Sequence, residues 1–145
     1  NKSDQAIEAI AATGGLIGMS VIPGFLGRSA DLNALLDHID HAVALVGAQH
    51  VAIGTDVCYV PPWSEGVKGF PGARWSSQWW GAWKPEYVSA PSDEHLAGSL
   101  AWTNWPMYTV GLVSRGYCDE DIRAIIGGNI LRVIADNEPD GMVRI

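Results

Sequence analysis

Hydrophobic residues recur at helical spacing near the start of the chain and then form a nearly continuous run. The spacing predicts a helix over residues 4–13. Ser3 or Asp4 can cap it, since a short side-chain oxygen accepts from the free N–H groups of a first turn. The apolar run from Leu16 to Ile22 predicts a parallel strand buried on both faces. A glycine pair between the two segments predicts the turn that joins them.

The same order of elements follows once more. An apolar stripe predicts a helix over about residues 32–47, capped by Asp31 and ended by Gly47. The segment 50–54 then predicts another buried strand. Helix–strand–helix–strand order indicates right-handed parallel units, so the expected class is α/β, either a doubly wound sheet or a (β/α) barrel.

The pattern breaks between Val60 and Ser99, where prolines and glycines interrupt any period. A loop of this length is uncommon in a compact domain and is usually functional or a lid. Helices are predicted again over about residues 106–115, 119–126 and 129–135. Asp119 is expected to cap the second of these helices.

Composition narrows the classes of function. Of the 145 residues, 48% are hydrophobic, which excludes a disordered chain, and the net charge of −7 argues against a nucleic-acid partner. No apolar run is long enough to cross a bilayer, and the compartment is left open. The two cysteines, Cys58 and Cys118, are too few for a disulfide framework. We expect free thiols, with a single bridge as the alternative.

The strongest chemical signal is a carboxylate directly after the second predicted strand. Gly54-Thr55-Asp56 places Asp56 at the carboxyl end of that strand. In barrel enzymes the active site lies at this face, so the position favours a catalytic role. The alternative is that Asp56 only caps the following loop.

Several segments together resemble the membrane (renal) dipeptidase family. Residues 4–25 (DQAIEAIAATGGLIGMSVIPGF) are similar to the family's seventh-strand region, and DHIDH at 37–41, LVG at 45–47 and HVAIGTD at 50–56 to the approach to its eighth strand. RGY at 115–117, DEDI at 119–122 and GGNILRV at 127–133 are similar to its C-terminal helices. The blocks occur in the family's order, and they cover most of the chain outside the Trp-rich segment.

The resemblance implies the C-terminal portion, meaning the last two strands and the helices, of an amidohydrolase-type (β/α)8 TIM barrel. It implies two zinc ions, with Asp56 serving the metal-bound water, and zinc brings the pKa of such water to roughly 7. The family's metal ligands and its substrate-binding arginine match no position here, so we expect no metal ligand in this segment.

The four histidines do not replace those ligands. His38 and His41 share a face of a helix that is expected outside the barrel. His50 begins a strand at the end opposite the active site, and His95 lies in the long loop. We therefore interpret all four as structural or solvated.

The chain departs from the family directly after Asp56. The family continues with an aromatic residue and Asp-Gly, whereas this chain continues with Val57, Cys58 and Tyr59. The second acidic residue is absent, which affects substrate preference more than fold. Cys58 has no histidine placed beside it by the sequence, so we interpret it as an inert thiol and not as a nucleophile.

The segment 60–99 is expected to overhang the active-site mouth. Its aromatic residues could wall a pocket for the substrate, form a subunit contact or pack beneath the loop. For the first case, the predicted substrate-binding residues are Tyr59, Trp79, Trp80 and Trp83. Arg74 or Lys84 could meet a substrate carboxylate. Trp102 and Trp105 are interpreted as packing residues.

Residues 1–145 are thus expected to form a single partial domain, with 60–99 as a loop insertion. A complete barrel needs about 250 residues, so we expect a partner chain or a longer protein to supply the rest, and the isolated segment to be inactive. The predicted function is zinc-dependent hydrolysis of dipeptides by a protein that is a homo-oligomer. The alternatives are hydrolysis of another small amide, such as an N-acyl amino acid, and a non-catalytic binding or assembly module.

Overall fold

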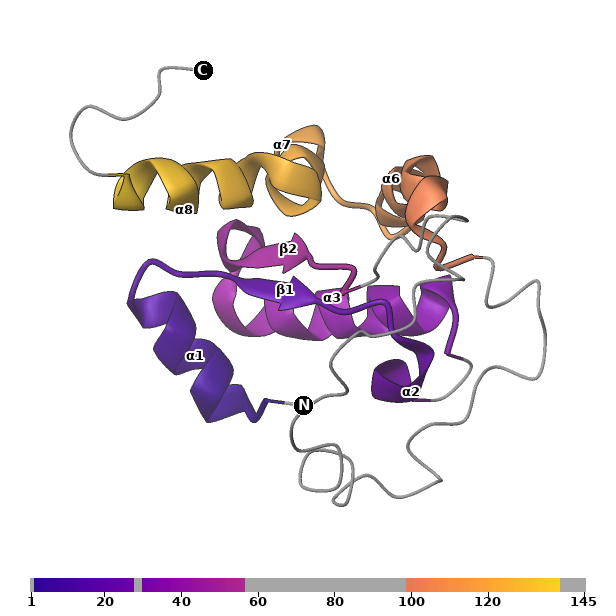
Figure 1. Cartoon of the computed structure of the whole chain (residues 1–145), viewed down its shortest axis with the longest axis horizontal. Helices are drawn as coiled ribbons and strands as arrows, with labels where there is room; N and C mark the ends of the chain where they lie inside the picture. Colours follow the sequence, from indigo (N-terminus) through magenta and orange to yellow (C-terminus); the bar gives the residue numbers. More distant parts are fainter. Residues whose placement is uncertain (1, 28–29, 57–98, 139–145) are drawn as a thin grey trace, which may run out of the picture.

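Two short parallel strands lie at the centre of the computed structural model, which describes residues 2–27, 30–56 and 99–138. Strand β1 (Ile17–Met19) pairs with β2 (Val51–Ile53), with Ile17 opposite Val51 and Met19 opposite Ile53. Helix α3 (Leu32–Val46) connects them and lies along the sheet (Figure 1). The predicted α/β class is therefore confirmed. The sheet in the described residues has these two strands only.

Helix α1 (Asp4–Ala12) begins and ends where the sequence places its caps. Ser3, not Asp4, is the N-cap, because its hydroxyl oxygen accepts from the N–H of Ala6 at 3.4 Å. Beyond Thr13, Gly14 has a φ of 81°, a conformation that is costly for residues with a Cβ. This turn sends the chain back into β1, antiparallel to the helix.

Helix α3 is fixed at both ends by residues that the pattern identified. Asp31 accepts from the N–H of Ala34 at 3.0 Å, and Gly47, with a φ of 84°, ends the helix. The buried face of α3 carries Leu35 and Ile39, each fully shielded from solvent. Two short segments flank this unit, the α2 turn (Pro23–Leu26) and the 3-10 turn η1 (Ala48–His50).

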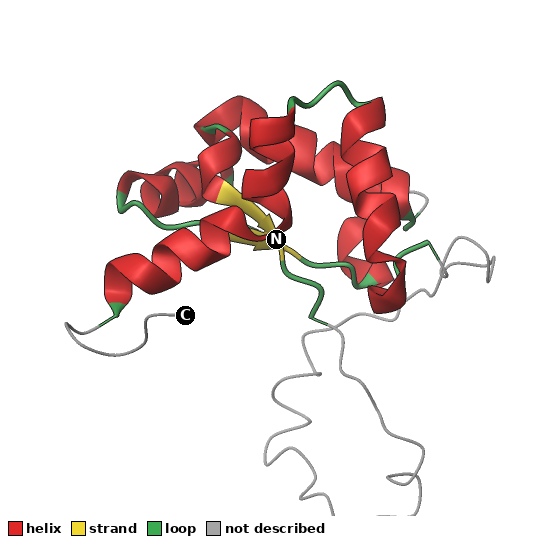
Figure 2. Ribbon diagram, turned by 90° about the horizontal axis from the view of Figure 1, so that it is seen from above, coloured by secondary structure: helices red, strands yellow, loops and turns green. Residues whose placement is uncertain are grey.

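The C-terminal part is helical, as predicted. After the 3-10 turn η4 (Trp102–Asn104), it consists of α6 (Trp105–Ser114), α7 (Asp119–Arg123), the π turn η5 (Ala124–Gly128) and α8 (Asn129–Asn137). Figure 2 shows how the helices surround the strands. The core contains Val21, Leu35, Ile39, Val51, Tyr108, Leu112 and Ile125.

Three details differ from the sequence-based expectations. Cys118, and not Asp119, is the N-cap of α7, because the Cys118 carbonyl already accepts the first helical hydrogen bond, from Ile122. Helix α7 ends at Arg123, and the rest of the helix expected over 119–126 takes the form of the π turn η5, in which Gly127 has a non-helical backbone. Strand β1 is shorter than 16–22 and is not buried on both faces. Gly18 is exposed because β1 has a neighbouring strand on one side only among the described residues.

Other predictions lie outside the described residues. They concern the loop insertion up to Ser99, His95, Cys58, Tyr59, Trp79, Trp80, Trp83 and the cations of that loop. Trp105 packs against the core and meets the Tyr108 ring edge-on at a centroid distance of 5.2 Å, which confirms its packing role. No helix within the described ranges is long and apolar enough to cross a membrane.

Candidate functional site

Asp56 lies at the carboxyl end of β2, where the sequence placed it. Ladder hydrogen bonds extend beyond the strand itself: the Gly54 N–H donates to Met19 at 2.9 Å, and Val21 donates to the Thr55 carbonyl at 3.3 Å. The chain is thus tied to the β1 segment up to Thr55, the residue directly before Asp56. The register of the ladder itself ends at the pair of Met19 and Ile53.

The backbone of Asp56 is left-handed, with a φ of 55°. Aspartate and asparagine tolerate this region better than most residues with a side chain, although it remains uncommon. The residue is exposed to solvent. An exposed carboxylate at the carboxyl ends of parallel strands can accept a proton from one reactant and return it to another.

A close approach of two glycines lies directly beneath this position. A Cβ atom on Gly54 would lie 3.3 Å from the Gly18 Cα, and one on Gly18 would lie 3.4 Å from the Gly54 Cα. The two backbones can meet this closely because neither residue has a side chain. The pair cannot be recognised in the sequence, since a glycine within an apolar run gives no sign of the strand opposite it.

The three described histidines make structural contacts. His38 Nε2 lies 3.0 Å from the carbonyl oxygen of Leu26, and His50 Nδ1 lies 2.7 Å from that of Gly15. His41 Nε2 lies 2.9 Å from the Asp4 carboxylate and so links α3 to α1. In residues 2–27, 30–56 and 99–138, no three histidine, cysteine or acidic side chains could hold one metal ion. This part of the chain does not fit a zinc site.

The GGNILRV segment ties the opposite end of the sheet together. The Asn129 side-chain amide, almost fully buried, donates to the carbonyl oxygens of Ala48 at 2.7 Å and Val51 at 2.8 Å. Arg132 donates from Nη1 to Gly14 at 2.9 Å and from Nη2 to Gln49 at 3.0 Å. These two side chains therefore hold the loops that enter both strands. Both side chains satisfy main-chain carbonyl groups at the amino ends of the strands, which indicates a structural role.

The Arg115-Gly116-Tyr117 segment holds α6 and α7 against α3. The Arg115 guanidinium donates to Asp37 at 2.9 Å and to Asp40 at 2.6 Å. Both carboxylates raise its pKa, and the hydrogen bond to Asp37 is the largest cause. The Tyr117 hydroxyl donates to Asp40 at 2.8 Å. Burial, and then this hydrogen bond, raise the pKa of Tyr117 above its usual range. Two segments that carry the family resemblance, DHIDH at 37–41 and RGY at 115–117, thus have a structural role in this cluster.

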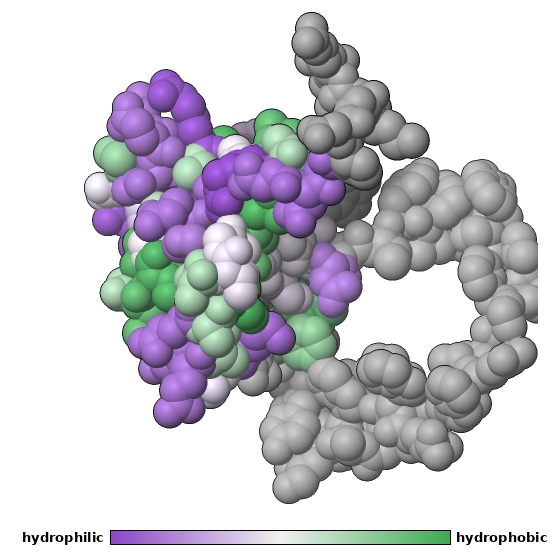
Figure 3. Space-filling model, turned by 90° about the vertical axis from the view of Figure 1, so that its left-hand side faces the viewer, coloured by the Kyte–Doolittle hydropathy of each residue, from purple (hydrophilic) through white to green (hydrophobic). Residues whose placement is uncertain are grey.

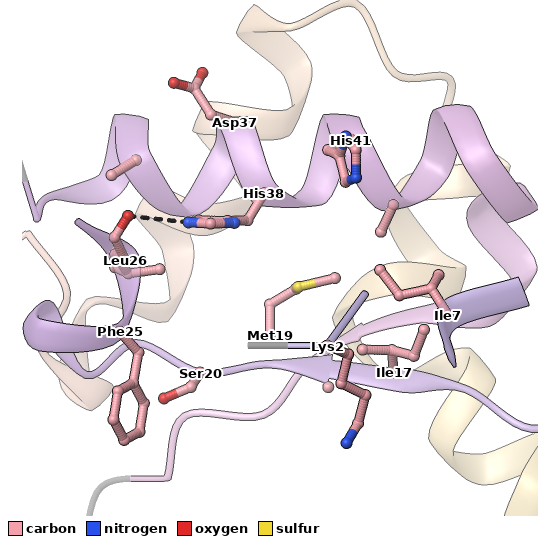
Figure 4. Close-up of a pocket in the computed structure, with 13 residues that line it drawn as sticks. Lys2, Ile7, Ile17, Met19, Ser20, Phe25, Leu26, Asp37, His38 and His41 are labelled. Atoms are coloured by element: carbon pink, nitrogen blue, oxygen red, sulfur yellow. Dashed lines mark hydrogen bonds between the residues drawn. The ribbon is translucent and has the colours of Figure 1, made fainter. Parts of the chain in front are cut away.

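A cavity of about 500 Å³ opens between α1, β1 and α3 (Figure 4). Ile7, Ile17 and Met19 form its apolar wall, and His38 and His41 face it from α3. It lies beside β1, and Asp56 is not among the residues that line it.

Apolar side chains are exposed on two of the C-terminal helices as well. They are Met107, Val110 and Val113 on α6, and Ile130, Leu131 and Ile134 on α8. Hydrophobic and hydrophilic residues also alternate on the side of the molecule that Figure 3 shows. Hydrocarbon surfaces of this kind offer area for packing and no reactive groups.

The comparisons to known proteins agree with the family resemblance of the first half of the chain. Residues 1–71 match the family model described as membrane dipeptidase, peptidase family M19. The resemblance drawn from the sequence is thereby confirmed for this segment, which includes both strands and Asp56.

A curated relative matches over a shorter stretch. The protein, described as an uncharacterized protein in the pqqA 5' region of Klebsiella pneumoniae, is 36% identical over 62 residues. These residues make up 39% of this chain and 23% of the relative, so the match covers less than a quarter of the relative's length. No solved structure matches the chain significantly.

Proposed function

We propose that this chain forms the last two strands and the C-terminal helices of a (β/α)8 barrel that hydrolyses dipeptides. The observation that carries the proposal is the position of Asp56. Asp56 is exposed, lies beyond the carboxyl end of β2 after Gly54 and Thr55, and falls within the residues that match the dipeptidase family. Parallel barrels carry their catalytic groups at this end of the strands.

The proposed role of Asp56 is proton transfer. Its carboxylate accepts a proton as water attacks the carbonyl carbon of the peptide bond. It then donates that proton to the amine nitrogen as the C–N bond breaks, leaving two amino acids and an unprotonated, reusable carboxylate. The main-chain hydrogen bonds that hold Gly54 and Thr55 limit how far this carboxylate can move.

The resemblance further implies two zinc ions, which would supply an activated water. The described residues do not fit such a site, so no step is assigned through zinc to this part of the chain. We propose that the ligands belong to the remainder of the barrel. Tyr59, Trp79, Trp80 and Trp83 stay candidate substrate-binding residues on the segment that follows Asp56.

The test compares two aspartate-to-asparagine variants of the complete gene product. Asp56→Asn removes the proton acceptor but preserves the left-handed backbone, which asparagine tolerates. We expect kcat for dipeptide hydrolysis to fall roughly 100-fold or more. Asp119→Asn is the matched control, since Asp119 is also exposed and lies at the start of α7. Its kcat should be unchanged.

Three outcomes separate the alternatives. Unchanged turnover in Asp56→Asn would remove Asp56 from the mechanism. Turnover of N-acyl amino acids without turnover of dipeptides would favour the related amidohydrolase. A folded protein with neither activity, measured with zinc supplied and its zinc content determined, would support a binding or assembly module.

A further inference from the structure

We propose that Ser20, at the carboxyl end of β1, is a substrate-binding residue whose hydroxyl donates a hydrogen bond to the terminal carboxylate of the dipeptide. This role rests on the proposed hydrolysis of dipeptides. It adds to Asp56, which handles the proton, a neutral group that holds the substrate on the neighbouring strand.

Ser20 lies beside the segment that leads to Asp56. The residues directly before and after Ser20 hydrogen-bond to Gly54 and Thr55. Ser20 therefore lies next to Gly54, two positions before Asp56. Parallel strands lie about 4.8 Å apart and rise about 3.3 Å per residue, so roughly 8 Å separates the Cα atoms of Ser20 and Asp56. One small substrate can meet both side chains across this distance.

The side chain of Ser20 leaves β1 on the side away from α3. Side chains alternate between the two faces of a strand. Ile17 and Met19 face the helices, and Val21 belongs to the core. Gly18 and Ser20 accordingly take the opposite face. Ser20 also borders the cavity, but its hydroxyl points away from α3, whereas Met19 points toward it (Figure 4).

The Ser20 hydroxyl is held in one orientation and keeps its donor. Its oxygen accepts from the Ile22 N–H at 3.2 Å, which directs Oγ toward the carboxyl end of the strand. A serine hydroxyl has one O–H donor in addition to its acceptor lone pairs. This O–H has no acceptor within residues 2–27, 30–56 and 99–138. The half-buried side chain thus presents an oriented donor to a ligand.

The surroundings of Ser20 suit the carboxylate of a small substrate. Gly18 lies on the same face, as does Gly54, whose neighbour Ile53 packs into the core, and neither glycine has a side chain that fills the space. Asp56 is proposed to protonate the leaving amine nitrogen, which shares its Cα with the terminal carboxylate. A donor on the neighbouring strand therefore lies within reach of that carboxylate. Hydrogen bonds to an ionised acceptor are stronger than those between neutral groups.

Steady-state kinetics of the complete gene product, with zinc supplied, test the role of Ser20. Ser20→Ala removes the donor, and Ser20→Thr retains it on a side chain that strands favour. Ser114→Ala is the matched control, because the Ser114 hydroxyl also bonds the nearby main chain, donating to Gly111 at 2.7 Å. The carboxylate is equally charged in the ground state and the transition state, so its loss of a partner affects KM and not kcat.

The C-terminal amide of the same dipeptide, used as a competitive inhibitor, shows whether Ser20 meets the carboxylate. The amide has the same side chains but lacks the negative charge. Its inhibition constant should therefore be alike in the unmodified protein and in Ser20→Ala. For the dipeptide, we expect KM to rise roughly 10-fold in Ser20→Ala, with kcat changed less than about twofold. KM should stay near the unmodified value in Ser20→Thr and in Ser114→Ala.

Two results overturn the role of Ser20. A fall in kcat at unchanged KM would show that the hydroxyl only holds the chain near Asp56. An equal weakening of dipeptide and amide would show that it does not meet the carboxylate. Absence of dipeptide turnover in the unmodified protein would contradict the proposed function, and calorimetric titration with the dipeptide then decides for Ser20. An unchanged Kd in Ser20→Ala, or no binding to either protein, would exclude it.

Discussion

The side-chain amide of Asn129 lies 2.8 Å from the carbonyl oxygen of Val51, the first residue of β2. The same nitrogen donates to Ala48, so one buried side chain satisfies two carbonyl groups at the start of the strand. The first residue of α8 is thereby joined to the end of the sheet opposite Asp56. The position of the last helix and the position of the candidate catalytic strand are set by the same contact.

Replacing Asn129 by alanine should therefore destabilise the protein strongly. Two buried carbonyl groups lose their donors, and we expect the free energy of unfolding to fall by about 3 kcal/mol. Asn137→Ala is the control, since the Asn137 amide donates to Val133 on an exposed face of the same helix. Urea unfolding of both variants measures the difference. An equal decrease in the free energy of unfolding of both variants would show that the buried hydrogen bonds of Asn129 stabilise the protein no more than the exposed one of Asn137.

Arg132 should not be replaceable by lysine without loss. Its two guanidinium nitrogens bind the carbonyl oxygens of Gly14 and Gln49 at once, and a single ammonium group cannot reproduce this fork. We expect Arg132→Lys to lower the free energy of unfolding by about 1 kcal/mol. Arg123→Lys should have almost no effect, because the Arg123–Asp119 pair is 3.7 Å long and largely exposed. Denaturant titration of both variants measures the two free energies of unfolding. An equal decrease in Arg123→Lys would refute the prediction.

The raised pKa of the Tyr117 hydroxyl predicts that the folded protein loses stability at alkaline pH. Its pKa is raised in the folded protein from the usual 10.0, so the unfolded chain ionises first as the pH rises. The contribution of the Tyr117 hydroxyl to the free energy of unfolding is fully present below about pH 10 and is lost as the pH rises further. Unfolding midpoints of the wild type and Tyr117→Phe, measured from about pH 8 to about pH 11, should therefore converge at the alkaline end.

The pKa of Tyr108 is also raised, because this side chain is buried. Tyr108 is retained in both proteins, so the difference between them isolates Tyr117. A difference that stays constant across the whole pH range would show that Tyr117 ionises alike in the folded and unfolded chains.

Of the two glycines that meet near Asp56, Gly54 should tolerate replacement by alanine less well than Gly18. A Cβ on Gly54 lies 3.3 Å from the Gly18 Cα, and this backbone atom cannot rotate away. We expect Gly54→Ala to cost about 1 kcal/mol of stability and to displace Asp56, lowering kcat. Gly18→Ala, with a looser contact of 3.4 Å, should lose less. Thermal unfolding and turnover of the two variants test this order, which the opposite ranking would contradict.

Much of the local structure could be predicted from the sequence. The cap at Asp31 and the stop at Gly47 depend on backbone geometry within a few residues, so the ends of α3 were predicted to within one residue. Asp56 was placed correctly because a carboxylate after a buried apolar run must follow the strand. The prediction that Asp119 caps α7 was wrong. The N-cap is Cys118, because the path of the preceding chain, and not the residue type, decides where the helix begins.

The long-range contacts could not be predicted in this way. Nothing in the local pattern shows that His50 meets Gly15 or that Tyr117 meets Asp40, since these partners are separated by 35 and 77 positions. The interpretation of His38, His41 and His50 as structural or solvated agrees with their contacts, but their partners depend on how the helices pack. His95 lies outside the described residues. The burial of β1 was overestimated for a related reason: an apolar run describes what a strand can bury and does not identify the neighbour that covers it.

The sequence by itself determined the order of helices and strands, the α/β class and the position of the one carboxylate at the end of β2. These features follow from the spacing of apolar residues and from the backbone preferences of a few capping residues. Only the tertiary structure showed that Asn129 and Arg132 hold the entrances of both strands, that Gly18 and Gly54 meet, and that a cavity lies beside β1. Such relations arise when distant segments fold against each other, and no local propensity encodes them.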